Sequence, residues 1–169
     1  PDEYFTYAAS RLRVALELAE ERDDDAAKEP VALLFAGRAA LYLGDDEATY
    51  RTHREAAARA RASGALSIVT QILPRLAITE LWAGRWASGS ANAREGVQLA
   101  REIGQHDLVA QQLVLLALIA ALRGSEDECR SLAAESRELA SARQLGIVLE
   151  LAHWALALPF AILGAGLFG

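Results

Sequence analysis

The feature that most constrains the fold of this chain is a glycine that recurs at a fixed interval. It follows an apolar run each time, at Gly44, Gly84, Gly124 and Gly164. Glycine readily adopts the left-handed conformation that ends many helices, because it has no Cβ to clash with the backbone. A period of about 40 residues is typical of proteins built from stacked helix pairs. We therefore expect each of these glycines to end a helix.

Two further series of residues keep the same period. Their members are Glu55, Glu95 and Glu135 in one series, and Ala60, Ala100 and Ala140 in the other. The second helix of each pair also runs into a glycine, at Gly64 and Gly104, whereas the third pair reaches Gly146 two residues late. The repeat therefore consists of a helix, a tight turn, a second helix and another turn.

This register predicts an all-α fold, a superhelix of tandem helix-turn-helix hairpins with about eight helices. The predicted helices span about 3–22, 27–43, 47–62, 66–83, 88–103, 107–123, 126–143 and 147–163. Polar residues that commonly cap helix N-termini lie at or just before the start of three of them, namely Asp45, Asp107 and Ser125. Pro74 lies inside one predicted helix, and we expect helix on both sides of it.

We expect a single helical-repeat domain over 1–169, taken from a longer protein, because the chain begins at Pro1 without a methionine. The last repeat, at about 147–169, is predicted to be truncated. Its charge-free stretch from Trp154 to Phe168 is shorter than the roughly 20 residues that span a bilayer, so we expect no membrane span. An apolar helix without its partner predicts homo-oligomerisation through this end.

Charge and cysteine content limit the partners and the compartment. The net charge is −6 and the pI is about 5.1, whereas nucleic-acid-binding domains are more often basic. We therefore expect no direct contact with nucleic acid. The single Cys129 cannot form an internal disulfide, which favours a reducing compartment and a cytoplasmic location.

The sequence predicts no catalytic residue, no metal site and no cofactor, and hence no enzyme. The last six residues match G-x-G-x-x-G, but a dinucleotide site needs a strand before that motif and a helix after it. The histidines have no metal-ligand spacing, and we expect His53 and His106 on the surface and His153 partly buried. Cys129 has no base nearby in sequence and is predicted to be a packing residue.

The recurring glutamates are predicted to have a structural role. Residues one repeat apart in a stacked array are roughly 10 Å or more apart, which is far for acid–base catalysis. We expect Glu55, Glu95 and Glu135 to bind arginines of an adjacent repeat.

Candidate binding residues lie on the first helix of each pair, which usually lines the concave surface of such folds. They are the positions that avoid the seam of small residues at 37, 77, 117 and 157. The candidates are Phe35, Arg38, Tyr42, Gln71, Arg75, Thr79, Trp82 and Gln111. Aromatic, amide and guanidinium groups together suit a protein or peptide partner or a small polar effector. The alternative is that these are ordinary solvated or inter-repeat residues.

Four stretches carry a resemblance to a known family. They are AGRAALYLGD (36–45), LAITELWAGRW (76–86), AREGVQLAREIGQ (93–105) and ECRSLAAESRELASARQLG (128–146). They resemble the tetratricopeptide-like region of large bacterial LuxR-type transcriptional regulators, which are ATP-binding activators similar to the maltose regulator. The resemblance covers about residues 30–158. It implies a middle segment between an N-terminal ATPase and a C-terminal helix-turn-helix, where a superhelix senses an effector or partner.

The function we expect is therefore that of a non-catalytic sensor and protein-interaction module in signal transduction and transcription regulation. The effector or partner would bind on the concave face. The alternative is a free-standing tetratricopeptide-like scaffold that binds a protein or peptide.

Overall fold

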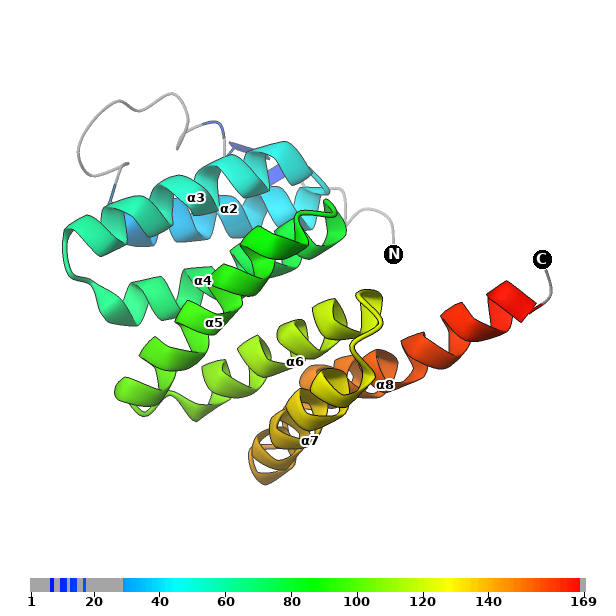
Figure 1. Ribbon diagram of the computed structural model, residues 1–169. Coiled ribbons are helices and arrows are strands. Elements are labelled where there is room, and N and C mark those ends of the chain that lie inside the picture. The colour runs from blue at the N-terminus through cyan, green and yellow to red at the C-terminus, as the bar shows by residue number, and fades with distance from the viewer. Residues whose placement is uncertain (1–6, 8–9, 12, 15–16, 18–28, 168–169) are drawn as a thin grey trace. The chain divides into compact units, whose positions relative to one another are not determined.

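The computed structural model describes residues 29–167 and, before them, residues 7, 10, 11, 13, 14 and 17; beyond residue 159 only the backbone is described (Figure 1). The helices of this part are α2 (Pro30–Leu43), α3 (Asp46–Ala62), α4 (Leu66–Trp82), α5 (Trp86–Glu102), α6 (His106–Leu122), α7 (Glu126–Ala142) and α8 (Gly146–Leu167). No strand occurs in this part of the chain, so it is all-helical as predicted. Most of the predicted helix at 3–22 lies outside the described residues.

The helices follow one another at a constant interval. From α3 to α8 they begin at positions 46, 66, 86, 106, 126 and 146, so two successive helices occupy one period of the glycine series. A glycine in the left-handed conformation ends α2, with φ 74° at Gly44, and glycines at positions 64, 84, 104 and 124 have φ between 70° and 73°. The next amide donates to the carbonyl five residues earlier, as from Asp45 to Ala40 at 3.0 Å and from Ser125 to Ala120 at 2.9 Å. Such bonds satisfy the last carbonyls of a helix.

Two of the glycines that were predicted to follow a helix end do not do so. Gln144, which lies one full period after Gly104, takes the left-handed conformation with φ 56°, and Gly146 is instead the first residue of α8. Gly164 does not end a helix, because α8 continues to Leu167. The turn conformation between α7 and α8 therefore follows the position in the repeat, even though the residue there is not glycine.

The predicted N-caps have mixed outcomes. Asp45 is confirmed, since its carboxylate accepts from the amide of Ala48 at 2.9 Å. Ser125 occupies the capping position of α7 without a side-chain hydrogen bond. Asp107 lies inside the first turn of α6, where it forms an ion pair with Arg143 at 2.9 Å. Pro74 lies within α4, with helix on both sides as predicted.

The chain divides into two compact units, Pro1–Thr79 and Glu80–Gly169. In the first unit, α2 packs against α3, and small side chains fill the contact. Ala36, Ala40 and Ala48 form a buried cluster with Leu43 against it. Alanine allows two helices to approach closely because little side-chain volume separates their backbones. This close approach determines which larger side chains fit beside α2.

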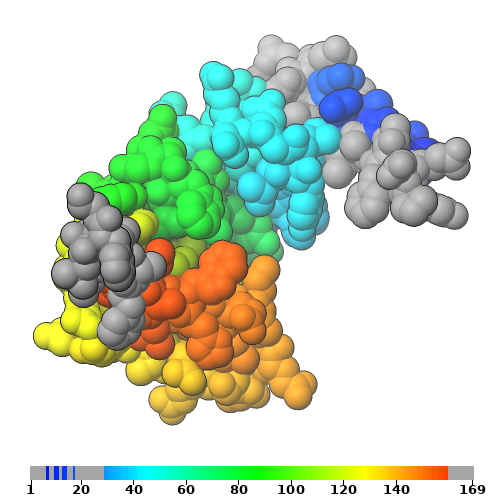
Figure 2. Space-filling model, turned by 90° about the vertical axis from the view of Figure 1, so that its right-hand side faces the viewer, coloured from blue at the N-terminus to red at the C-terminus, as the bar shows by residue number. Residues whose placement is uncertain are grey.

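In the second unit, α6 packs against α5, α7 and α8 (Figure 1). Within positions 109–121 only Gln111 is not buried. A helix that is apolar on all sides is buried on all sides, and α6 is the core helix of this unit. Val114 of α6 packs in one cluster with Val148 and Ala152 of α8. Figure 2 shows the surface of α8, in orange, beside that of α7, in yellow to gold.

Exposed ion pairs link α5 to α7. Arg94 pairs with Glu128 at 3.1 Å, and Arg101 pairs with Glu135. The expectation that a recurring glutamate binds an arginine of another repeat is thus confirmed for Glu135, whereas Glu55 pairs with Arg59 of its own helix at 2.9 Å. Exposed pairs of this kind contribute about 0–1 kcal/mol each. No described helix is long and apolar enough to cross a membrane.

Candidate functional site

Three of the predicted binding residues share one face of α2. Phe35, Arg38 and Tyr42 are spaced by three and four residues, which places side chains one above the other on a helix. The Arg38 guanidinium carbon lies 5.8 Å from the centre of the Phe35 ring, a distance at which a cation is attracted to an aromatic face. Phe35 is 59% exposed and Tyr42 is 70% exposed. This face therefore presents two large aromatic rings to solvent with a cation beside one of them.

α4 contributes Gln71 and Arg75, which are one turn apart. Gln71 is exposed, and its amide donates to the Ser67 carbonyl at 3.1 Å. Arg75 is half-buried, and its Nη1 donates to the Gln71 carbonyl. One helical turn of α4 thus holds the Arg75 side chain against its own backbone.

Arg75 and Arg38 lie close enough to repel each other. Burial lowers the pKa of Arg75, the positive charge of Arg38 lowers it further, and the Tyr42 phenol acts in the opposite direction. Within the described part of the chain, no carboxylate forms an ion pair with either arginine. We refer to Arg38 and Arg75, with Phe35 and Tyr42 beside them, as the arginine-pair site.

His53 of α3 is fully buried beside this site, so the prediction of a surface histidine is wrong. Its ring packs on Gly37 so closely that a Cβ at Gly37 would lie 2.7 Å from the His53 Nε2 atom. Neither ring nitrogen forms a hydrogen bond of good geometry among the described residues, although backbone groups of Thr49 and Leu34 lie close enough to affect the ring. The small residue at position 37 admits the ring between α2 and α3, which explains the burial.

The surroundings keep His53 neutral. Burial lowers the pKa of His53 to about 4, the charge of Arg75 adds to this effect and that of Arg38 contributes less, while backbone groups of Thr49 and Leu34 oppose the shift. At pH 7 the ring is therefore an uncharged polar group behind the arginine-pair site.

The other predicted binding residues lie elsewhere. Thr79 is buried, and its hydroxyl donates to the Arg75 carbonyl at 2.8 Å, so we leave it out of the candidate site. Trp82, which is exposed, and Gln111, which is half-buried, belong to the second unit. Phe35, Arg38 and Tyr42 therefore share a face of α2, and Gln71 and Arg75 share a turn of α4. The charges on Arg38 and Tyr42 affect the pKa of Arg75.

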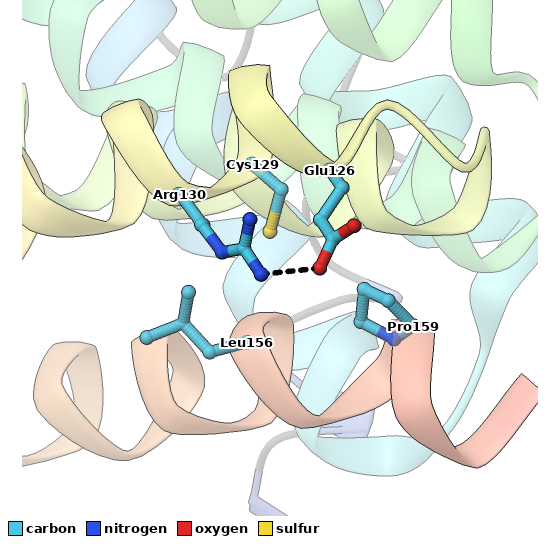
Figure 3. Close-up of a pocket in the computed structure, with 5 residues that line it drawn as sticks. All are labelled: Glu126, Cys129, Arg130, Leu156 and Pro159. Carbon is cyan, nitrogen blue, oxygen red and sulfur yellow. Dashed lines mark hydrogen bonds and ion pairs between the residues drawn. The ribbon is translucent and has the colours of Figure 1, made fainter.

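A small pocket lies between α7 and α8 in the second unit. Its lining residues are Glu126, Cys129, Arg130, Leu156 and Pro159 (Figure 3). The cavity volume is about 210 Å³, below the roughly 300–1,000 Å³ of pockets that hold drug-sized ligands. Arg130 forms ion pairs with Glu126 and Asp127 of its own helix. The charged groups of this pocket are thus already paired with one another.

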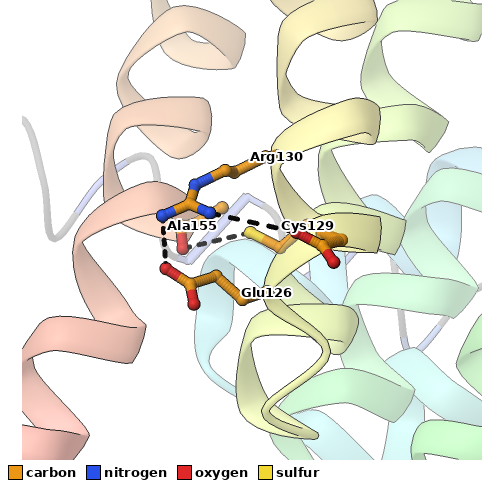
Figure 4. A network of polar contacts seen from close by, with 5 residues as sticks. Glu126, Cys129, Arg130 and Ala155 are labelled. Carbon is orange, nitrogen blue, oxygen red and sulfur yellow. Dashed lines mark hydrogen bonds and ion pairs between the residues drawn. The ribbon is translucent and has the colours of Figure 1, made fainter.

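Cys129 has a structural role next to this pocket. Its thiol donates to the Ala155 carbonyl, with a sulfur–oxygen distance of 3.4 Å (Figure 4). In a regular helix that carbonyl accepts from the amide four residues later, but this residue is Pro159, which has no N–H. Burial raises the pKa of the Cys129 thiol, which keeps the proton on the sulfur.

The second unit also buries polar groups that the sequence did not reveal. Glu80 accepts hydrogen bonds from Ser88 and, at 2.7 Å, from Asn92. Gln112 is fully buried, and its amide has no hydrogen-bond partner among the described residues. A Cβ at Gly96 would overlap the Gln112 side-chain amide. As at Gly37, a helical glycine makes room for a polar side chain.

The remaining histidines lie on the surface. His106 is exposed as predicted, whereas His153 is exposed rather than partly buried. Among the described residues, no group of three or more His, Cys, Asp or Glu side chains could hold a metal ion. Compared with known proteins, the chain matches no family model and no curated protein.

Proposed function

We propose that this chain is a non-catalytic binding module and that it holds an effector or partner on the face formed by α2 and α4. The observation that carries the proposal is the arginine-pair site. Arg38 and Arg75 are both half-buried residues, the charge of Arg38 lowers the pKa of Arg75, and two exposed aromatic rings lie on the same helix as Arg38. Arginine and aromatic residues contribute most of the binding energy in many interfaces.

The helical scaffold suits this role. Side chains on helices that are held by packed neighbours keep their positions better than side chains on loops. Arg38 and Tyr42 lie on α2, whose inner face is buried against α3, and Arg75 is held by a contact within α4. A ligand would therefore meet groups that need little further ordering, which reduces the entropic cost of binding.

We further propose that the module belongs to a cytoplasmic transcriptional regulator and folds as a tetratricopeptide-like superhelix. The support is the resemblance of four stretches between residues 36 and 146 to the sensor region of LuxR-type regulators, together with the regular spacing of the helices. In this proposal the module binds no cofactor and makes no direct contact with DNA. It transmits ligand binding to neighbouring domains.

The gene on either side of this stretch tests the regulator proposal. We expect a P-loop sequence upstream, of the form G-x-x-x-x-G-K-[ST], and a helix-turn-helix downstream. A gene that encodes neither would contradict this proposal and favour a free-standing scaffold.

The response of the full-length protein tests the binding face. In a reporter strain we expect the combined Phe35→Ala and Tyr42→Ala change to reduce the effector-dependent response, because both exposed rings lie on the proposed face. Ile103→Ala is the control, since Ile103 is also a large exposed apolar residue but lies at the end of α5, outside the proposed face. An equal loss in both variants would contradict the placement of the binding face.

A further inference from the structure

We propose that two copies of this chain bind each other through α8, with the two α8 helices antiparallel about a twofold axis. The contact surface is the outer face of α8, which we define as the exposed residues on this helix between positions 146 and 159. They are Gly146, Ile147, Glu150, His153, Trp154 and Ala157. This face belongs to the second unit, so the proposal does not depend on ligand binding at α2.

The outer face of α8 exposes two large apolar side chains on one stripe. Ile147 and Trp154 are seven residues apart, a spacing that returns to the same side of a helix after two turns. Ile147 is 77% exposed and Trp154 is 60% exposed. Tryptophan is enriched among the residues that contribute most of the binding energy in interfaces. The outer face therefore has the composition of a contact surface.

The repeat indicates that a helix covers this face. Trp154 occupies the position that Val114 occupies one period earlier, on α6. Val114 is buried in a cluster with Val148 and Ala152 of α8, so on α6 this position lies inside a contact between two helices. The stacking surface between α6 and α8 thus continues onto the outer face of α8, and a further helix packed there would extend it.

The charges on this face favour α8 of a second copy as the covering helix. Glu150 and His153 are both exposed and lie three residues apart, on one side of the helix. If a twofold axis passes between positions 151 and 152, each Glu150 lies opposite His153 of the second copy. An imidazole N–H can donate to a carboxylate, so the two side chains suit each other. A parallel pair would instead bring the two Glu150 carboxylates together, which is unfavourable.

The same alignment also matches the apolar side chains. It places Ile147 opposite Leu156 of the second copy and Trp154 opposite Leu149 of the second copy, and both leucines are half-buried. Because the face binds itself, each contact occurs twice in the dimer. A single pair of helices lies at the small end of specific interfaces, below about 1,200 Å². We therefore expect a reversible dimer with a Kd on the order of micromolar.

Sedimentation velocity of the chain tests the surface. Concentrations from about 1 to about 300 µM span the expected Kd, and about 0.15 M salt screens the net negative charge. We expect a concentration-dependent shift from monomer to dimer. Trp154→Ala should raise the Kd by about thirtyfold or more. Trp82→Ala is the matched control, since Trp82 is an equally exposed tryptophan on α4 and should leave the Kd unchanged.

Exchanging the two polar groups tests the occupant and the alignment. Glu150→Arg places a cation opposite His153, and His153→Glu places a carboxylate opposite Glu150. Each single change should raise the Kd by about tenfold, because the unfavourable contact occurs twice. The double variant carries Arg opposite Glu and should regain the native Kd to within about threefold. Glu138→Arg, at an exposed position of α7, is the control and should have no effect.

Circular dichroism of every variant checks that the helices are kept. A monomer at all concentrations would overturn the proposal, and so would a Kd that responds to Trp82→Ala as much as to Trp154→Ala. A double variant that stays as weak as the single variants would overturn the antiparallel pairing. These results are independent of the reporter response to the loss of Phe35 and Tyr42, which tests the proposed function on the first unit.

Discussion

Replacing Gly37 by alanine places a methyl group where the ring of His53 lies. The new Cβ would be 2.7 Å from Nε2, 2.8 Å from Cδ2 and 2.9 Å from Cε1, distances too short for these atoms. Alanine in a helix gains about 1 kcal/mol over glycine, whereas forcing extra volume into a packed core costs about 1–3 kcal/mol. We therefore expect Gly37→Ala to lower the free energy of unfolding by about 1 kcal/mol, despite the better helix propensity of alanine.

Removing the ring should reverse the sign of this effect. In a His53→Ala background the methyl group has space, so Gly37→Ala should be neutral or stabilising by up to about 1 kcal/mol. The coupling between the two positions should then be about 1–2 kcal/mol, within the range for residues in contact. Urea denaturation at pH 7, followed by circular dichroism, measures all four proteins. Gly146→Ala is the control, because nothing lies within 4 Å of its added Cβ.

The refuting result is a change at Gly37 of the same size in both backgrounds. That result would mean that the His53 ring does not pack on Gly37. It would also remove the explanation for the burial of His53 next to the arginine-pair site.

The remaining predictions concern the buried His53, the left-handed backbone conformation of Gln144 and the hydrogen bond from Cys129 to a backbone carbonyl. The folded state lowers the pKa of His53 from 6.5 to about 4, so the unfolded chain binds a proton first as the pH falls. His53 should therefore lower the free energy of unfolding from about pH 6.5 downward. The loss should be complete below about pH 4 and reach about 3 kcal/mol. Gln144→Gly should raise the free energy of unfolding by about 1 kcal/mol, because Gln144 has a φ of 56° that glycine adopts without strain. Cys129→Ala should lower it by about 1–2 kcal/mol by removing the donor to a buried carbonyl, whereas Cys129→Ser keeps a donor and should lower it less.

Urea denaturation with matched variants checks these three predictions. His53→Leu should reduce the pH dependence of the free energy of unfolding between about pH 4 and 6.5, whereas replacement of the exposed His106 by Gln is the control. An unaltered pH dependence in His53→Leu would show that His53 does not cause it. Gln105→Gly should not stabilise the chain, since φ is −87° there, and a gain equal to that of Gln144→Gly would refute the strain argument. Equal losses for the alanine and serine variants of Cys129 would exclude the hydrogen-bond explanation.

The helices were predictable because their signals are local. Glycines with a left-handed preference recur at fixed spacing, and the predicted ranges from 47–62 onward agree with α3 to α7 to within two residues at each end. Where the glycine does not lie at the expected repeat position, the left-handed turn still forms at that position. Gln144 takes the turn conformation in place of the later Gly146, and α7 and α8 pack against each other on either side of this turn.

The candidate site was predictable in part. The helical register placed Phe35, Arg38, Tyr42 and Arg75 among the candidates, because their spacing on helices is a property of the sequence. The surroundings of the two arginines were not predictable, since ion pairs such as Arg94 with Glu128 join residues 34 positions apart through tertiary packing. The burial of His53 depends in the same way on the space above Gly37, which involves two helices.

The effector-dependent response of the full-length protein tests the central claim, that the exposed face of α2 binds the ligand, most directly. The account predicts a reduced response when Phe35 and Tyr42 are both replaced by alanine, while the fold and the thermal stability are kept. An unchanged response in that folded variant would contradict it.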